Sequence, residues 1–553
     1  MKKRFAAIFS AIICIAASSA GCTRVAPSME TASSGNAGPN PWTIPGVLRI
    51  GARLVPDNLN PVVGTQEIDT DLAILWSDFL FTFDDQNRMV PDLAVEVPSL
   101  RNGGISPDGM KVTYHLHHGV KWQDGAPFSA DDIVFTWHAV MNPKNLVPSR
   151  SGYDLISRID EPDKYTVVVH LIKPFAPFIR VFETLSSSSY PALPKHLLGN
   201  LPDINHADFN NHPIGTGPFR VTSGQKDVEL KFVANPQYFR GAPKLKEIDF
   251  RVVPNDNTLL TLIRTHEIDM YYRASEAQAP MLNAIPGTSL YMTPFTRFAD
   301  IGLNAGNPPL DDVRVRRALA YATNKAELIR KITHGVNIPA DSDQPPFLWA
   351  HDNNVTRYDF NPRRAAALLD EAGWRVGPDG VRQKNGKTLS LLMTGYSGSA
   401  TVDAVQEVIQ REWKDVGVEI EIKNYPTDLL YAPAAEHGIE QSGRFDAIYE
   451  SWGNGSDPDD TVLFGCDRVP PNGWNVYHFC SPKLDAAERI ALSENDQSKR
   501  TAAYATVQEV LTDQVPVIFL WFERYITVTN SDLKNFKPSH VGTQWWNAWE
   551  WSI

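Results

Sequence analysis

Few residues of this chain stand in patterns that do chemistry, and each pattern has a plainer alternative. His115 and His117 would project from the same face of a strand, as a pair of metal ligands does, but an ordinary strand with exposed histidines looks the same. The run Asp457-Pro458-Asp459-Asp460 lacks the glycine and the final glutamate of a calcium-binding loop. We therefore expect no resident metal ion.

Catalytic patterns are missing as well. In Gly395-Tyr396-Ser397-Gly398-Ser399 the second glycine comes too early for the nucleophile elbow of a hydrolase. The chain has neither a His-Glu-x-x-His zinc motif nor a phosphate-binding loop. A secreted hydrolase would need a nucleophile with its base, or a pair of carboxylates, and no specific set occurs. We expect a protein that is not an enzyme and needs no cofactor.

The N-terminal residues have the layout of an export signal. Lys2, Lys3 and Arg4 precede the apolar run 5–17, which is too short to span a membrane. Small residues then lead into Cys22, and this resembles the lipobox of bacterial lipoproteins, in which the cysteine is lipidated. An ordinary secretory signal is the alternative. Residues 23–45 are rich in Ser, Gly, Pro and Ala and are typical of a flexible tether.

Two cysteines remain in the exported part. Cys466 and Cys480 are fourteen residues apart, and an oxidising compartment favours a disulfide between them, with two separate buried thiols as the alternative. The whole chain has 553 residues and a net charge of −12. This length predicts two or three domains, and the acidic balance argues against nucleic-acid binding.

Strand and helix patterns both occur between these segments. Period-two alternation predicts strands over 47–51, 110–120, 165–171, 246–253 and 418–422. Helical spacing and end signals predict helices over 311–332, 361–373, 402–416 and 499–514. Strands that alternate with helices indicate an α/β fold.

Three long motifs identify a family. They are residues 119–135 (GVKWQDGAPFSADDIVF), residues 213–219 (PIGTGPF) followed by Asn235 to Tyr238, and residues 301–304 (IGLN) followed by 308–319 (PPLDDVRVRRAL). Together they resemble the extracytoplasmic solute-binding proteins of family 5, the dipeptide- and oligopeptide-binding components of ABC importers. The resemblance runs from about residue 46 to the end of the sequence.

The motifs themselves have local structural explanations. Ser129 is suited to cap a helix, with Asp132 three residues later completing a capping box. The glycines of the second motif suit a tight turn. Asp311 and Asp312 place negative charge at a helix start. We interpret these residues as folding devices and not as ligand contacts.

The resemblance implies a periplasmic-binding-protein-like architecture of two lobes joined by a hinge, with an extra domain inserted in the first lobe. On this basis lobe I comprises 46–80, 199–303 and 522–553, the inserted domain 81–198, and lobe II 304–521. Ligand would be enclosed as the lobes close.

The resemblance also implies positions that contact the ligand. They are Thr65, Gln66, Arg297, Phe298, Tyr425, Trp452, Asn454 and Asp457. The family Asp that meets a peptide amine would fall at Asn454 or Gly455, and Asp457 is its possible replacement. Arg297 could instead form a surface or interlobe ion pair, and core packing is the alternative for Tyr425 and Trp452. The aromatic tail around Trp545 to Trp551 is interpreted as packing on lobe I.

The expected function follows from these implications. We expect a monomeric, lipid-anchored protein, in the periplasm or on the outer face of the cell membrane, that captures di- and oligopeptides and delivers them to an ABC permease. The same scaffold could bind a sugar, a nickel chelate or an opine-like compound. It could also sense peptides without importing them.

Overall fold

The computed structural model describes residues 38–182 and 189–553. The predicted export signal, Cys22 and most of the predicted tether over 23–45 lie outside these residues. The chain divides into two compact units, Met1–Asn40 and Pro41–Ile553, and the fold below is that of the second. Within the described residues, no helix is long and apolar enough to cross a membrane.

An eleven-stranded sheet runs through this unit. Its order is β17-β16-β18-β11-β19-β10-β1-β9-β8-β7, and β12 pairs with β19 beside this path. We call the part built on β1 and β7 to β10 lobe I, and the part built on β16 to β18 lobe II. The strands are β1 (Val47–Ala52), β7 (Phe219–Gln225), β8 (Glu229–Ala234), β9 (Glu247–Val252), β10 (Met270–Ala274), β11 (Thr288–Leu303), β12 (Ile338–Pro339), β16 (Ser390–Thr394), β17 (Glu419–Ile422), β18 (Ala447–Gly453) and β19 (Val517–Asn530).

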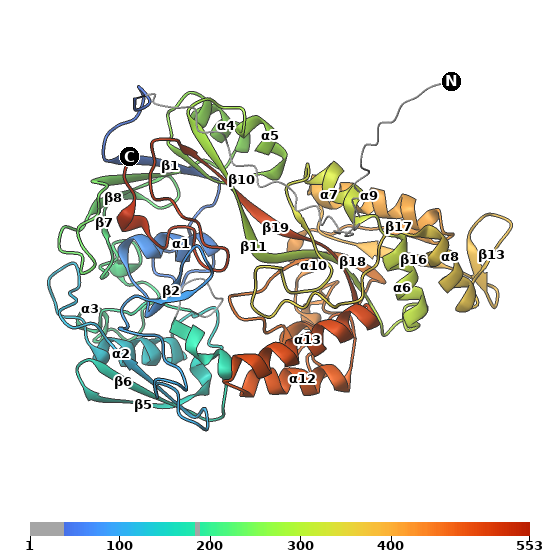
Figure 1. The fold of residues 1–553 in the computed structure, drawn as a ribbon, viewed down its shortest axis with the longest axis horizontal. Helices are drawn as coiled ribbons and strands as arrows, with labels where there is room; N and C mark the ends of the chain where they lie inside the picture. The colour runs from blue at the N-terminus through green and yellow to red at the C-terminus, as the bar shows by residue number, and fades with distance from the viewer. Residues whose placement is uncertain (1–37, 183–188) are drawn as a thin grey trace, which may run out of the picture. The chain divides into compact units, whose positions relative to one another are not determined.

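Two long strands, β11 and β19, belong to both lobes (Figure 1). In lobe I, β19 pairs with β10, and in lobe II, β11 pairs with β18. The two strands also pair with each other, and their register shifts between Pro294 and Phe298. Such an irregularity re-aims the side chains near it. Arg297 lies in this stretch, where the chain passes from one lobe to the other.

The inserted segment of lobe I packs into the same core as the rest of that lobe. Buried Val112 and Tyr114 from the insert belong to one cluster with Leu48, Trp545 and Trp551. The predicted packing of the aromatic tail on lobe I is therefore confirmed. The insert contains β2 (Phe81–Phe83), β3 (Met89–Pro91), β4 (Lys111–His115), α2 (Ala130–Met141), β5 (Ile156–Asp163), β6 (Thr166–Leu171) and α3 (Lys195–Leu198), and the helices of the rest of lobe I are α1 (Glu67–Trp76), α4 (Asp256–Arg264) and α5 (Ala279–Leu282).

Two sequence motifs of lobe I act as folding devices. The capping box at the start of α2 is present, since the Ser129 amide donates to Asp132 at 3.0 Å. The glycines of the second motif have a different reason from the predicted tight turn. A Cβ on Gly215 would lie 1.9 Å from the carbonyl oxygen of Trp76, and one on Gly217 would lie 2.5 Å from the amide nitrogen of Ser77. Their role is close approach to the end of α1.

Lobe II surrounds its strands with helices, whose apolar faces form two buried clusters. The helices are α6 (Val313–Ala322), α7 (Lys325–Ile332), α8 (Pro362–Glu371), α9 (Ala400–Lys414), α10 (Thr427–Leu430), α11 (Thr461–Phe464), α12 (Pro482–Ser493) and α13 (Gln497–Gln514), and a small sheet joins β13 (Arg375–Val376), β14 (Arg382–Lys384) and β15 (Lys387–Thr388).

The single helix predicted over 311–332 is wrong, because two helices occupy this range. Thr323 has extended backbone, which ends α6, and the Asn324 side chain accepts from the Glu327 amide to begin α7. The helical spacing of apolar residues continues across Thr323, so the sequence pattern gave no sign of the break between α6 and α7. Of the two alternatives for the cysteines, the disulfide holds: Cys466 and Cys480 are bonded.

Candidate ligand-binding site

A network of charged side chains lies where α1 of lobe I meets the crossing strands. Arg273 pairs with Glu67 at 2.9 Å and with Asp71 at 3.1 Å, and the Tyr525 hydroxyl donates to Glu67 at 2.9 Å. Burial alone would raise the pKa of Glu67, but Arg273 and its other partners lower it to about 2. Glu67 is thus an anion held in place by Arg273 and Tyr525.

Arg297 and Glu523 extend this network across the crossing strands to lobe II. Arg297 lies 3.8 Å from the Glu67 carboxylate and 4.0 Å from that of Glu523. The Ser451 hydroxyl on β18 donates to Glu523 at 2.9 Å. Burial raises the pKa of Glu523; Arg297 and Ser451 oppose the shift, whereas Glu276 and Glu67 add to it. The charged groups of the two lobes therefore meet on one face of the crossing strands.

The backbone of β18 next to Ser451 has an open edge. Strand β16 pairs with β18 only through Ala447 and Ile448, within the described part of the chain. The rest of β18, up to Gly453 opposite Arg297, pairs with β11 on its other side. Ser451 and Gly453 are exposed. An edge of this kind can accept an extended chain as an added strand.

The predicted residues Thr65, Gln66 and Arg297 lie around this network. Thr65 and Gln66 are exposed and directly precede Glu67. The Thr65 hydroxyl donates to Asp57 at 2.5 Å, and the Gln66 amide donates to Thr65 at 3.1 Å. For Arg297 the interlobe ion pair, the alternative to a ligand contact, is present, but at distances too long for hydrogen bonds.

Three predicted aromatic residues pack into or against a core of lobe II. Phe298 is only 1% exposed and meets Phe519 edge to face, so the structure places its ring away from solvent. Trp452 pairs with Phe298 across the sheet and is half-buried against the same cluster. Tyr425 is half-buried there too. For Tyr425 and Trp452 the packing alternative describes what the structure shows, and Phe298, for which only a ligand contact was predicted, is a core residue.

Asn454 and Asp457 are tied to other protein groups. The Asn454 side chain is buried and donates to the carbonyl oxygen of Asp343 at 3.3 Å. Arg500 donates to both carboxylate oxygens of Asp457, at 2.7 and 2.9 Å. Arg180, in the 3-10 turn Ala176–Phe182 of the insert, lies 3.2 Å from the same carboxylate. The charge of Asp457 is therefore compensated by two arginines.

Sequence reasoning missed Glu67, Ser451 and Glu523. Two of them were one position away from a predicted residue, Glu67 after Gln66 and Ser451 before Trp452. Glu523 carried a clearer signal, because Glu523 and Arg524 are the only charged residues in the strand Val517–Asn530. A charged pair inside a mostly apolar strand indicates a special position.

A chain of buried carboxyl groups lies beneath Asn454 and Asp457. Burial raises the pKa of Asp343 to about 6 and that of Glu488 to about 8, and it raises the pKa of Asp460, which contacts both, well above its ordinary value. These buried carboxyl groups therefore keep their protons to a higher pH than solvent-exposed Asp and Glu side chains do. Across residues 38–182 and 189–553, no three His, Cys, Asp or Glu side chains are arranged to hold a metal ion.

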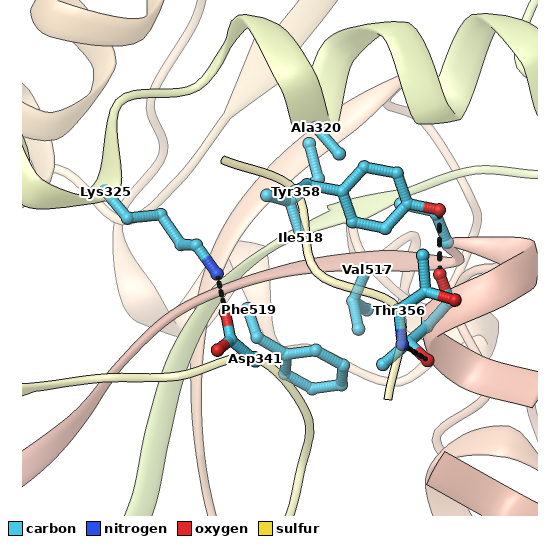
Figure 2. A pocket seen from close by; sticks show the side chains of 10 residues that line it. Ala320, Lys325, Asp341, Thr356, Tyr358, Val517, Ile518 and Phe519 are labelled. Carbon is cyan, nitrogen blue, oxygen red and sulfur yellow. Dashed lines mark hydrogen bonds and ion pairs between the residues drawn. The ribbon is translucent and has the colours of Figure 1, made fainter. Parts of the chain in front are cut away.

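Two pockets lie away from the charged network and are not part of the candidate site. A small pocket of about 20 Å³ in lobe II is lined by residues such as Lys325, which pairs with Asp341 at 2.7 Å, and Tyr358 (Figure 2). That volume suits roughly one water molecule. An open depression of about 470 Å³ lies on the insert, next to Lys111 and His170. Neither is lined by the charged network.

The fold is the two-lobe architecture of the periplasmic-binding class. The model of the bacterial extracellular solute-binding proteins, family 5, matches residues 88–470. The chain belongs to this family, whose members are extracytoplasmic binding proteins.

Known relatives are similar in sequence over 79% to 92% of this chain. The oligopeptide-binding protein AppA of Bacillus subtilis is 25% identical over 518 residues, covering 92% of this chain and 91% of its own. The dipeptide-binding protein of Escherichia coli is 27% identical over 467 residues, with 79% and 83% covered. Among solved structures, NikZ from Campylobacter jejuni in complex with Ni(L-His) is 25% identical, has a TM-score of 0.75, and is matched over 92% of this chain and 100% of its own.

Proposed function

We propose that this protein captures di- and oligopeptides between its lobes and delivers them to an ABC permease. The observation that carries the proposal is the open edge of β18 at Ser451 to Gly453, flanked by Arg297 and Glu67. A peptide added along this edge would satisfy its backbone hydrogen bonds whatever its side chains are, and the charged groups would meet its polar ends. Relatives named as dipeptide- and oligopeptide-binding proteins support the same choice.

A metal chelate is the second candidate ligand, because NikZ with bound Ni(L-His) is a close structural match. A thermal-shift screen separates the two, since a ligand that binds only the folded protein raises its melting temperature. We expect di- to hexapeptides to raise it, and a mass spectrum of the natively purified protein to contain peptides. If nickel-histidine or sugars shift the melt and no peptide does, the peptide proposal is wrong.

The finer features of the proposal rest on the sequence. Cys22 would carry the lipid anchor, and the chain would act as a monomer without catalysis. The lobe boundaries proposed above, with lobe II over 304–521, complete this description. Labelling of cells with a radioactive fatty acid tests the anchor: label should enter the wild-type protein and not the Cys22→Ala variant. A permease gene next to this one would favour import over sensing.

A further inference from the structure

A peptide with a free N-terminus needs an anionic partner for its ammonium group, and Asp457 is poorly placed for this role. Two arginines and the Tyr504 hydroxyl, at 3.3 Å, already surround its carboxylate. Its side chain is only 11% exposed. A ligand ammonium would have to displace a guanidinium that is held by short, charge-assisted hydrogen bonds. The ammonium partner must be sought elsewhere.

The Glu523 carboxylate, unlike that of Asp457, can still accept a hydrogen bond from a ligand ammonium. Its Oε1 accepts one hydrogen bond, from Ser451, and its Oε2 lies 4.0 Å from Arg297, beyond hydrogen-bond distance. The Glu523 side chain is 24% exposed, so a ligand can reach it. Glu523 is on β19, and its side chain reaches Ser451 of β18 across β11, the strand between them.

The surrounding charges favour a cation at this point. Arg273 faces both Glu67 and Asp71, and Arg297 faces both Glu67 and Glu523, while Glu276 acts on Glu523 as well. The carboxyl groups of this network therefore outnumber its two arginines. A ligand ammonium would reduce this imbalance, and an anionic ligand would add to it.

Arg297 offers a complementary donor next to Glu523. Its Nε is buried and, within the described residues, has no hydrogen-bond partner. The ammonium nitrogen and the first carbonyl oxygen of a peptide are separated by about 3 Å, given ordinary bond lengths. Glu523 Oε2 and Arg297 Nε are 4.0 Å apart. The Glu523 carboxylate can therefore accept from the ammonium while Arg297 Nε donates to the carbonyl oxygen of the same peptide residue.

We propose that Glu523 binds the terminal ammonium of a peptide ligand while Arg297 donates to its first carbonyl oxygen. This inference rests on the proposed peptide-binding function and adds the ligand class, peptides with a free N-terminus. It also replaces Asp457 as the ammonium partner.

Titration calorimetry with trialanine and N-acetyl-trialanine tests the proposal. Wild-type protein should bind trialanine at least tenfold more tightly, the size of a hydrogen bond to a charged group. Glu523→Gln should lose this preference by weakening trialanine and sparing the acetylated peptide. Glu509→Gln, which removes a surface carboxylate paired with Lys483, should keep the wild-type preference.

The Asp457→Asn variant provides a second test, whose result does not depend on whether the Glu523 variant folds. The proposal expects this variant to keep its preference for trialanine, even if both peptides bind more weakly. Three results would overturn the assignment of Glu523 and leave peptide binding in place. The preference for trialanine could be lost in Asp457→Asn, retained in Glu523→Gln, or absent from the wild type. A wild-type protein that binds neither peptide overturns the proposed function itself.

Discussion

The Arg180 guanidinium lies 3.2 Å from the Asp457 carboxylate, and this ion pair joins the inserted segment of lobe I to lobe II. Both side chains are largely buried, at 15% and 11% exposure, so solvent screens the pair weakly. Arg500 holds Asp457 from within lobe II. The contact is therefore available only while the lobes are close together.

Removing this ion pair should open the protein. We expect Arg180→Ala to increase the radius of gyration of the ligand-free protein and to weaken ligand binding at least about fivefold, because a smaller fraction is in the closed form. Small-angle scattering and calorimetry measure the two effects. Arg158→Ala, which breaks an exposed pair with Asp160 on the same insert, should change neither. An unchanged radius in Arg180→Ala would mean that the pair does not hold the lobes.

Stability should fall as the pH rises through the range in which the buried carboxyls of lobe II hold protons. The pKa of Asp343 is about 6 and that of Glu488 about 8 in the folded protein, both above their ordinary values. The folded state therefore keeps protons that the unfolded chain releases above about pH 4. The contribution of these two groups to the free energy of unfolding should be constant below that pH and decrease from about pH 4 to pH 8. Glu67, whose pKa is lowered to about 2, acts in the other direction and loses its contribution as the pH falls below about 4.

Urea unfolding at fixed pH values measures this slope. Glu488→Gln stays neutral at every pH and should make the slope shallower. Glu509→Gln, at an exposed position, should leave it unchanged. A free energy of unfolding that rises between pH 5 and pH 8 would contradict the assignment.

The disulfide should stabilise the loop that supports Trp452. The bridge from Cys466 to Cys480 encloses Trp474, whose ring lies 6.5 Å from that of Trp452. Closing a loop of this length is worth about 3 kcal/mol in the chain-entropy model. The double variant Cys466→Ser/Cys480→Ser should lose roughly that amount in denaturant unfolding. Adding a reductant should weaken the wild type and have no effect on the variant.

Gly215 should tolerate no side chain. A Cβ there would lie 1.9 Å from the Trp76 carbonyl oxygen, and a backbone atom has little room to move away. We expect Gly215→Ala to lose more than about 2 kcal/mol of folding free energy through overpacking. Gly455→Ala is the matched control, because no atom lies within 4 Å of its added Cβ. Equal melting temperatures for the two variants would refute the close-approach explanation.

Local signals in the sequence predicted much of the fold. The strands around Val47–Ala52 and Glu247–Val252 followed from alternation, and the capping residue Ser129 followed from its position before a helix. The break at Thr323 was missed because both helices share one apolar spacing. Short-range patterns state where elements lie, and they are least informative where two elements join.

The candidate site was less accessible to prediction because its groups come from distant parts of the chain. Arg297 was identified by resemblance, but its neighbours Glu67 and Glu523 depend on how α1 and β19 meet at β11. Similarly, Asp457 could be read as a ligand contact until Arg180 and Arg500 were found beside it. Charge compensation is a property of the folded arrangement and not of either segment alone.

The shared core of lobe I sets an order for folding during export. Leu48 and Trp551 pack in the same cluster, although all of lobe II lies between them in the chain. If the chain emerges from its N-terminus, lobe II can form its own cores while lobe I still waits for its last residues. Lobe I would then be exposed to proteases for longest, and any truncation before Trp545 would remove the ring that packs on Phe250 and Tyr272.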